Sequence, residues 1–337
     1  MGEHAGEPDA SVLDALSRMT LSRSGDTVRF TPLAGGVASD IWKVETGGRT
    51  FCVKRALARL RVRDEWLVTV ERNAYEVGWI ETARRLAPGS APRILGADRE
   101  ANLFAMEWLP PDRFPVWKSL LMDGSARVEH ARAVGETLAA IHSGTANRPE
   151  VAERFRTDAI FRDIRLDAYL GAAARRHPEL SEILLGSIET TARTRLALVH
   201  GDVSPKNILM GTEGPVFLDA ECAWYGDPAF DIAFCLNHLL LKCLWRPASA
   251  SDYLGCFAAL SEAYLGRVDW EPEQNIEARA AALLPGLLLA RVDGKSPVEY
   301  LTGEEDKATV RRAAERMLRD RPARLGTVRE QWREAIA

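Results

Sequence analysis

Two neighbouring segments, LVHGDVSPKNILM at 198–210 and GPVFLDAECAWYGDPAFDIAF at 214–234, place polar side chains inside apolar, strand-like runs. His200, Asp202 and Asn207 lie in the first segment, and Asp219 ends an apolar run in the second. Burying a carboxylate costs several kcal/mol unless it is paired or binds a cation. The chain must therefore fold so that these side chains find partners or a ligand.

The spacing of these residues is specific. His-Gly-Asp followed after four residues by Asn fixes four residue types, which chance gives about once in several hundred chains of this length. Asp219 follows Asn207 in the run VFLDAE. An Asp and an Asn on one loop, with a second Asp ending a β-hairpin, would supply a base beside an acceptor hydroxyl and two oxygen ligands for magnesium. These are the groups that phosphoryl transfer requires.

Length and composition limit the class of protein. The chain has 337 residues, 46% of them hydrophobic and 27% charged, as in a folded protein with two domains or lobes. The net charge is -4, and the lysines and arginines are dispersed among acidic residues, so we expect no nucleic-acid partner. The first residues lack a signal-peptide pattern and the apolar stretches are too short for a bilayer, so we expect a cytoplasmic protein with no membrane partner. The sequence leaves the oligomeric state open.

The hydrophobic pattern changes along the chain. Residues 26–55 contain two alternating runs, DIWKVE and TFCVKR, joined by the hairpin turn TGG. A helix is predicted over 68–86 and two short strands over 91–109, whereas helical patterns dominate after Pro110 and Pro111. We therefore predict an α+β fold with a small β-rich lobe and a larger, mainly helical lobe. The predicted domains are a tail and helix at 1–25, the first lobe at 26–110 and the second lobe at 111–337.

The predicted first lobe contains an ordered set of polar and glycine residues. Gly35 and Gly36 lie in a loop between strands, where glycine lets backbone amides approach a phosphate. Lys54 ends the next strand and Glu76 lies on the following helix. Each feature alone is more typical of a turn, an edge charge or a helix surface. Together they form a glycine loop, a strand lysine and a helix glutamate in order.

With these motifs the chain resembles the aminoglycoside phosphotransferase and choline kinase group of small-molecule kinases, which have a protein-kinase-like fold. HGDVSPKN matches the catalytic loop of the group, FLDAE its metal-binding aspartate segment and GDPAFDIA the helix that follows. The segments VKRALARLRVRDEWLVTVERNAYE and ECAWYGDPAFDIAFCLNHLL are most similar to methylthioribose kinases, whereas the SPKN ending departs from them. Kinase chemistry is therefore better supported than methylthioribose as the substrate.

The resemblance implies a role for each matching residue. Asp202 would orient or deprotonate the acceptor hydroxyl, and Asn207 and Asp219 would hold Mg²⁺. Lys54 would contact the α- and β-phosphates of ATP and pair with Glu76, for which Glu71 is a competing candidate. The segment MEWLP at 106–110 would present backbone groups to adenine. The full set of predicted nucleotide-binding residues is Gly35, Gly36, Ser39, Lys54, Glu76, Glu107 and Leu109.

Other residues are predicted to support the catalytic loop. Asp227 and Pro228 are typical of a helix N-cap and a first-turn proline. Asp231 is predicted to brace the loop, and the alternative is an exposed acid favoured by the helix dipole. His200 is interpreted as a scaffold for the loop. Two further histidines are expected to pack in the core, His142 and His238.

The acceptor site is expected in the second lobe, around Asp202, Trp224 and the segment LLLARVDGKSPVEYL at 287–301, where Arg291, Asp293 and Lys295 follow an apolar helix. A solvated helix end is the alternative for this segment. Two cations to one anion favour a sugar or polyol over a polycationic aminoglycoside, although the acidic run GEED at 303–306 favours the reverse.

Three other classes of protein share some of these features. An aminoglycoside O-phosphotransferase and a nucleotide-binding pseudokinase remain open, although every polar catalytic position is filled. A protein kinase is disfavoured because the chain lacks the Asp-Phe-Gly and Ala-Pro-Glu motifs that bracket an activation loop.

Overall fold

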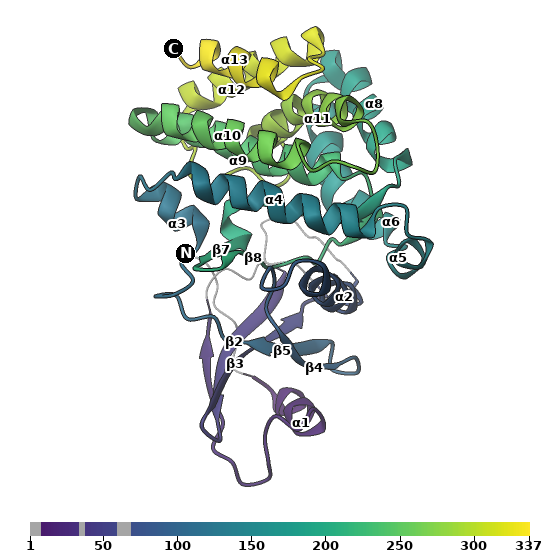
Figure 1. Cartoon of the computed structure of the whole chain (residues 1–337), viewed down its shortest axis with the longest axis vertical. Helices are drawn as coiled ribbons and strands as arrows, with labels where there is room; N and C mark the ends of the chain where they lie inside the picture. The colour runs from purple at the N-terminus through teal and green to yellow at the C-terminus, as the bar shows by residue number, and fades with distance from the viewer. Residues whose placement is uncertain (1–7, 34–37, 59–68) are drawn as a thin grey trace. The chain divides into compact units, whose positions relative to one another are not determined.

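The structure is a computed structural model that describes residues 8–33, 38–58 and 69–337 (Figure 1). The chain divides into two compact units, Met1–Arg113 and Phe114–Ala337. Among the described residues, no helix is both long enough and apolar enough to cross a bilayer.

The first unit is built on an antiparallel sheet with the strand order β1-β2-β3-β5-β4. Its elements are α1 (Ala10–Arg18), β1 (Arg29–Pro32), β2 (Ser39–Thr46), β3 (Arg49–Ala56), α2 (Arg72–Leu86), β4 (Ile94–Asp98) and β5 (Leu103–Glu107). The predicted TGG hairpin is present between β2 and β3. Gly47 and Gly48 have φ values of 53° and 74°, the left-handed conformations that a tight hairpin turn needs. Side chains of α1 pack with those of β2, β3 and β5 in one apolar core.

The second unit is mainly helical. Its helices are α3 (Trp117–Met122), α4 (Val128–Thr145), α5 (Pro149–Arg154), α6 (Asp158–Phe161), α7 (Ala172–Arg176), α8 (Ser181–Arg193), α9 (Ala229–Trp245), α10 (Ala250–Leu265), α11 (Glu273–Asp293), α12 (Glu304–Asp320) and α13 (Leu325–Ala335). Two small antiparallel ribbons complete it, β6 (Ala197–Val199) with β9 (Trp224–Gly226), and β7 (Ile208–Gly211) with β8 (Gly214–Phe217). The predicted α+β fold, with a small antiparallel sheet and a larger helical part, is confirmed.

Helix α9 is the central helix of this unit. It is buried from Ala229 to Cys243 and packs against α10 and α11 (Figure 1). A helix that is apolar on all sides is stable only inside a core. Helices α4 and α10 also pack closely. A Cβ at Gly135 of α4 would lie only 2.4 Å from the carbonyl oxygen of Leu260 in α10, so glycine permits this close approach. The few polar side chains of α9 are therefore buried, and each needs an explanation.

One predicted helix differs from expectation. The segment LDAYLGAAARRH, expected as one α-helix, lies in a π-helix at Arg162–Gly171 followed by α7. π-Helical turns are rare and occur frequently at functional sites. This turn carries Arg165, which contacts the catalytic loop.

Candidate active site

The loop that follows β6 is held by one carboxylate of α9. Asp231 accepts hydrogen bonds from the backbone N–H groups of His200 at 2.7 Å and Gly201 at 2.8 Å. Gly201 has a φ of 82°, and a Cβ there would lie 2.8 Å from Cys222. Glycine is therefore required at this turn.

Asp231 is fully buried, so it is not the exposed first-turn acid that the sequence left as an alternative. Its Oδ2 lies 3.3 Å from Nε2 of His142, whose Nδ1 is 2.8 Å from the Tyr264 hydroxyl. These contacts link α4, α9 and α10 beneath the loop. His142 is a buried packing histidine, as predicted.

His200 connects the loop to the β7–β8 hairpin. The N–H of Asp202 donates to His200 Nδ1 at 3.1 Å, so Nδ1 is the acceptor nitrogen. Nε2 then carries the proton and donates to the carbonyl oxygen of Leu218 at 3.1 Å. Burial lowers the pKa of His200, which favours this neutral form. His200 therefore positions Asp202, the scaffold role that the sequence suggested.

Asp202 lies among positive charges. Its Oδ2 is 3.0 Å from Arg165 Nη2 and 3.5 Å from Lys206 Nζ. Burial raises the pKa of Asp202, but Lys206 and Arg165 outweigh it and bring the pKa to about 2. A carboxylate this acidic is a weak base, so the arrangement suits orienting a hydroxyl better than removing its proton. No described residue hydrogen-bonds to its Oδ1, which leaves that oxygen for an acceptor.

The two cations beside Asp202 were not among the residues predicted from the sequence. Lys206 lies inside the SPKN ending of the catalytic loop and could have been found there. Arg165 carries no local signal, because it is far upstream in the π-helix and is joined to the loop only by the fold. Its Nε donates to the carbonyl oxygen of Gly201.

Asn207 and Asp219 lie at the open end of the same hairpin. Ile208 of β7 pairs with Phe217 of β8, and the next N–H, of Leu218, donates to the Asn207 carbonyl oxygen at 2.8 Å. The Asn207 Nδ2 donates to the Asp202 carbonyl oxygen at 3.1 Å, which orients its side-chain oxygen as a possible ligand.

Asp219 itself has a strained backbone. Its φ is 69°, a left-handed conformation that costs a non-glycine residue about 1–2 kcal/mol. The strain at this position is consistent with a functional role. Its side chain is half-buried, less enclosed than its apolar run suggested.

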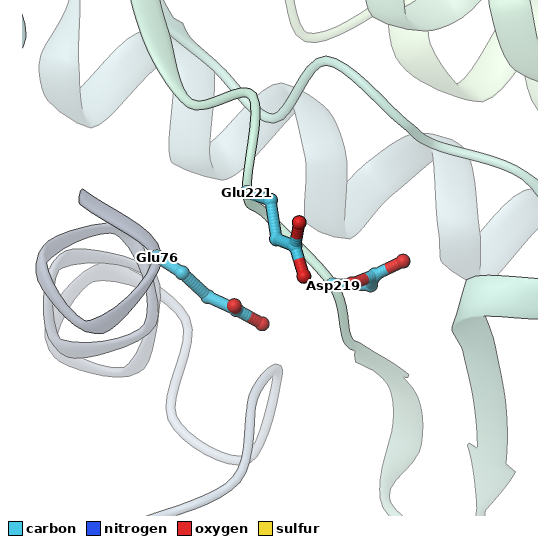
Figure 2. A group of neighbouring side chains, drawn as sticks. All are labelled: Glu76, Asp219 and Glu221. Atoms are coloured by element: carbon cyan, nitrogen blue, oxygen red, sulfur yellow. The ribbon is translucent and has the colours of Figure 1, made fainter. Parts of the chain in front are cut away.

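Glu221 is a further candidate ligand that the sequence analysis did not name. Figure 2 shows Asp219 and Glu221 on the segment that follows β8, and one carboxylate oxygen of each lies within 4.8 Å of the other. Glu221 is 7% exposed. Carboxylate and amide oxygens are the ligands that Mg²⁺ prefers, so this donor set fits magnesium.

In the first unit, Lys54 and Glu76 form a buried ion pair. Lys54 Nζ, on β3, lies 2.9 Å from Glu76 Oε1, on α2, and both side chains are almost fully enclosed. Figure 2 also shows the Glu76 carboxylate extending from α2. Glu71, the competing candidate, is exposed and precedes the helix. A buried pair contributes little net stability. The pair therefore fits a role in function better than a role in stability.

The other predicted nucleotide residues have mixed outcomes. Ser39 is a buried residue at the start of β2. The N–H of Glu107 donates to the Arg93 carbonyl oxygen at 2.9 Å, so that amide is not available to adenine. Leu109 lies beyond the end of β5. Gly35 and Gly36 lie outside the described residues.

Trp224 has a packing role. It is 1% exposed, its ring stacks on Phe161 at 4.4 Å, and its Nε1 donates to Asp158 Oδ1 at 3.0 Å. The contacts of the ring, with Phe161, and of Nε1, with Asp158, are internal, and the expected acceptor contact of Trp224 stays a prediction. The sequence could not show this, since Phe161 and Trp224 meet only in the folded chain.

Asp293 and Lys295 also make internal contacts. The Asp293 carboxylate accepts from Arg311 at 2.8 and 2.9 Å and lies 2.8 Å from His177 Nε2, so it anchors the end of α11. Lys295 is exposed, and its backbone N–H donates to the Ala168 carbonyl oxygen at 3.0 Å. The predicted acceptor contacts of these two residues stay predictions.

Asp227 caps α9. Its Oδ1 accepts from the N–H of Ala229 at 3.0 Å, and Pro228 has helical backbone angles. The carboxylate also pairs with Arg279 of α11 at 3.0 Å. Asp227 therefore fixes the start of the helix that carries Asp231.

The comparisons with known proteins agree with this geometry. A model described as "Phosphotransferase enzyme family" matches residues 29–263. The chain belongs to this phosphotransferase family, as the predicted resemblance implied.

Individual relatives share only low sequence identity with this chain. Methylthioribose kinase 1 of Oryza sativa subsp. japonica is 24% identical over 248 residues, which cover 66% of this chain and 58% of the relative. The chain thus spans less than two thirds of that protein. A solved aminoglycoside phosphotransferase from Alicyclobacillus acidocaldarius is 17% identical and covers 98% of both chains with a TM-score of 0.53. A choline/ethanolamine kinase family protein from Mesorhizobium loti is 14% identical, covering 95% of this chain and 98% of that one, with a TM-score of 0.52. These two structures share the fold.

Proposed function

We propose that this protein is a small-molecule kinase that transfers the γ-phosphate of ATP to a hydroxyl group, with Mg²⁺ as cofactor. The observation that carries the proposal is the catalytic loop, in which Asp202 is held ionised by Arg165 and Lys206 and positioned by His200. This constellation provides a carboxylate that accepts a hydrogen bond from a hydroxyl group and cations for a phosphoryl group.

Each part of the site has a task in this mechanism. Asp202 accepts a hydrogen bond from the acceptor hydroxyl and aligns its oxygen for in-line attack. Lys206, next to Asp202, stabilises charge on the transferred group. Asn207 and Asp219 would hold Mg²⁺, with Glu221 as a further ligand; the ion would neutralise the phosphate oxygens. Lys54 would contact the α- and β-phosphates of ATP and would be held in place by Glu76. Phosphoryl transfer has a mainly loose transition state, so the protein contributes mostly by positioning the reactants and by electrostatic stabilisation.

The acceptor is proposed to be a sugar or similar polyol. The name of the methylthioribose kinase relative supports a sugar hydroxyl, although that protein is longer than this chain. The enclosed Arg291 does not suit a polycationic aminoglycoside. The filled catalytic positions argue against a pseudokinase. We place the activity in the cytoplasm, because the five cysteines are buried and unpaired, as in a reducing compartment.

An Asp202→Ala variant tests this function. Calorimetry should show ATP affinity near that of the wild type, whereas turnover in an ATP-consumption screen of sugars, polyols, choline-like amino alcohols and aminoglycosides should fall by roughly two to four decades. The control is Asp163→Ala, an exposed acid of the π-helix, which should keep full turnover. Wild-type turnover by Asp202→Ala would refute the assignment. ATP binding without turnover of any acceptor by the wild type would favour the pseudokinase.

A further inference from the structure

Two buried cations in the second unit have no acidic partner. Lys242 is 1% exposed and Arg291 is 7% exposed. Across the described parts of the chain, no carboxylate oxygen lies within 4.0 Å of either side chain's nitrogens. Taking a cation out of water costs several kcal/mol, so an enclosed cation without a counter-ion calls for a compensating group.

The surroundings of Lys242 compensate only in part. Its Nζ lies 4.9 Å from the ring centre of Trp245 and 4.5 Å from that of Tyr300. Cation–π contacts of this kind contribute about 2 kcal/mol when desolvated, less than the cost of enclosure. Burial, with the charges of Lys118 and Arg291, outweighs the opposing charge of Glu299 and lowers the pKa of Lys242 to about 8. The lysine therefore remains mainly charged at neutral pH, and among the described residues it has no carboxylate in ion-pair contact.

Arg291 is held by neutral groups. Its Nη1 donates to the Tyr169 hydroxyl at 3.2 Å, to Ser296 Oγ at 3.2 Å and to the Ser296 carbonyl oxygen. Within the described residues, its Nε has no hydrogen-bond partner, and the same is true of the buried Tyr300 hydroxyl and His238 Nε2. Buried polar atoms are normally paired. Three buried polar atoms without a hydrogen-bond partner, together with two enclosed cations, indicate a missing ligand.

These residues lie within electrostatic range of the catalytic carboxylate. Burial lowers the pKa of His238 well below its usual value, and Arg291, Lys242 and Lys206 lower it further. Two of the same cations act on Asp202: burial raises its pKa, whereas Lys206 and Arg291 lower it. Arg291 therefore lies within electrostatic range of Asp202, and Lys242 lies within electrostatic range of Arg291.

We propose that Lys242 and Arg291, with Tyr300 and His238 beside them, form a subsite for an anionic group on the acceptor. This inference rests on the proposed function and narrows it: the hydroxyl compound would carry a carboxylate or phosphate, as a sugar acid or polyol phosphate does. The anion would neutralise the two cations and accept hydrogen bonds from Arg291 Nε and Tyr300. A polycationic acceptor would meet repulsion here.

Binding of matched probes, measured by calorimetry without ATP, tests the subsite. The pairs are gluconate against glucose, for the carboxylate source, and glycerol phosphate against glycerol, for the phosphate source. In at least one pair the anionic member should bind at least about tenfold more tightly than its neutral partner. Lys242→Met and Arg291→Met should each reduce that affinity about tenfold or more and remove most of the preference. The control Lys307→Met, in α12, should bind like the wild type.

A second measurement separates a ligand site from a structural role. Lys242→Met keeps an apolar stem of similar length and removes an enclosed charge, so the ligand-free variant should melt no lower than the wild type. Melting below the wild type together with unchanged probe binding would show that Lys242 is structural, which overturns the subsite.

Three other results would also overturn the proposal. These are equal binding of neutral and anionic probes, no anionic binding up to about 10 mM, and a loss of ATP affinity in Lys242→Met instead of probe affinity. The last would assign the cations to ATP phosphates. Anionic binding that depends on Lys242, without phosphorylation of any probe in the presence of ATP, would leave the subsite standing and count against the kinase activity.

Discussion

Asp231→Asn is the sharpest test of how the catalytic loop is held. The two side chains have the same shape, so the change replaces one carboxylate oxygen by an NH₂ group without leaving a cavity. Asp231 Oδ2 faces the His200 N–H and His142, and Oδ1 faces the Gly201 N–H. The least costly arrangement keeps oxygen at the first position and sets NH₂ against the Gly201 N–H.

The cost follows from the lost contact and the new mismatch. A hydrogen bond to a charged group contributes about 1.5–3 kcal/mol, and a buried N–H left without an acceptor costs about 1–3 kcal/mol. These terms overlap, because both concern the Gly201 N–H, so we expect a loss of about 3 kcal/mol in the free energy of unfolding. The loop should also shift at Asp202, so kcat/KM for any acceptor should fall more than ATP affinity.

The assay is urea unfolding followed by circular dichroism, with kcat/KM measured alongside. Asp252→Asn is the matched control, because Asp252 lies in the first turn of α10 but is exposed. Asp252→Asn should lose only the favourable interaction of the carboxylate with the helix dipole, which lowers the free energy of unfolding by about 0.3–1 kcal/mol. If Asp231→Asn costs no more than Asp252→Asn and keeps full kcat/KM, the bracing argument is refuted.

Three further predictions concern the metal, the loop glycine and pH. Asp219→Ala should abolish the Mg²⁺ dependence of ATP binding while leaving the fold intact; a normal rise in affinity during magnesium titration would show that Asp219 is only structural. Gly201→Ala should destabilise the protein by roughly 2–4 kcal/mol in urea unfolding, because of its φ of 82° and the 2.8 Å approach to Cys222, and an unchanged midpoint would contradict this. The pKa of Lys242, lowered to about 8, means that its positive charge is lost as pH rises through that value. Gluconate affinity should therefore fall above about pH 8, by up to about tenfold per pH unit, while the neighbouring Glu299, whose pKa is lowered, stays ionised; a flat calorimetric profile from pH 7 to pH 10 would exclude Lys242 as the titrating contact.

The features that could be predicted from the sequence depend on local patterns. The TGG turn predicts the β2–β3 hairpin, because only glycine adopts two successive left-handed conformations easily. The run HGDVSPKN sets Asp202 and Asn207 on one loop, because a few residues of chain fix their separation. The two lobes follow from the change in hydrophobic period.

The neutralisation of the buried charges was decided by tertiary structure. Arg165 reaches Asp202 from a π-helix far upstream, and His142 reaches Asp231 from α4. The internal partners of Trp224 and Asp293, which are Phe161 and Arg311, could not be predicted because they lie elsewhere in the chain.

Lys242 and Arg291 show the same division. Each lies in an apolar helix whose pattern predicts burial of its neighbours, but the sequence does not say whether a carboxylate will meet it. Local propensity and period act over a few residues, whereas Coulomb and desolvation energies depend on which distant side chains the fold brings within a few ångströms. The sequence by itself determined most of the secondary structure, apart from the π-helix at Arg162–Gly171, and the catalytic loop, and only the tertiary structure decided which charges are paired.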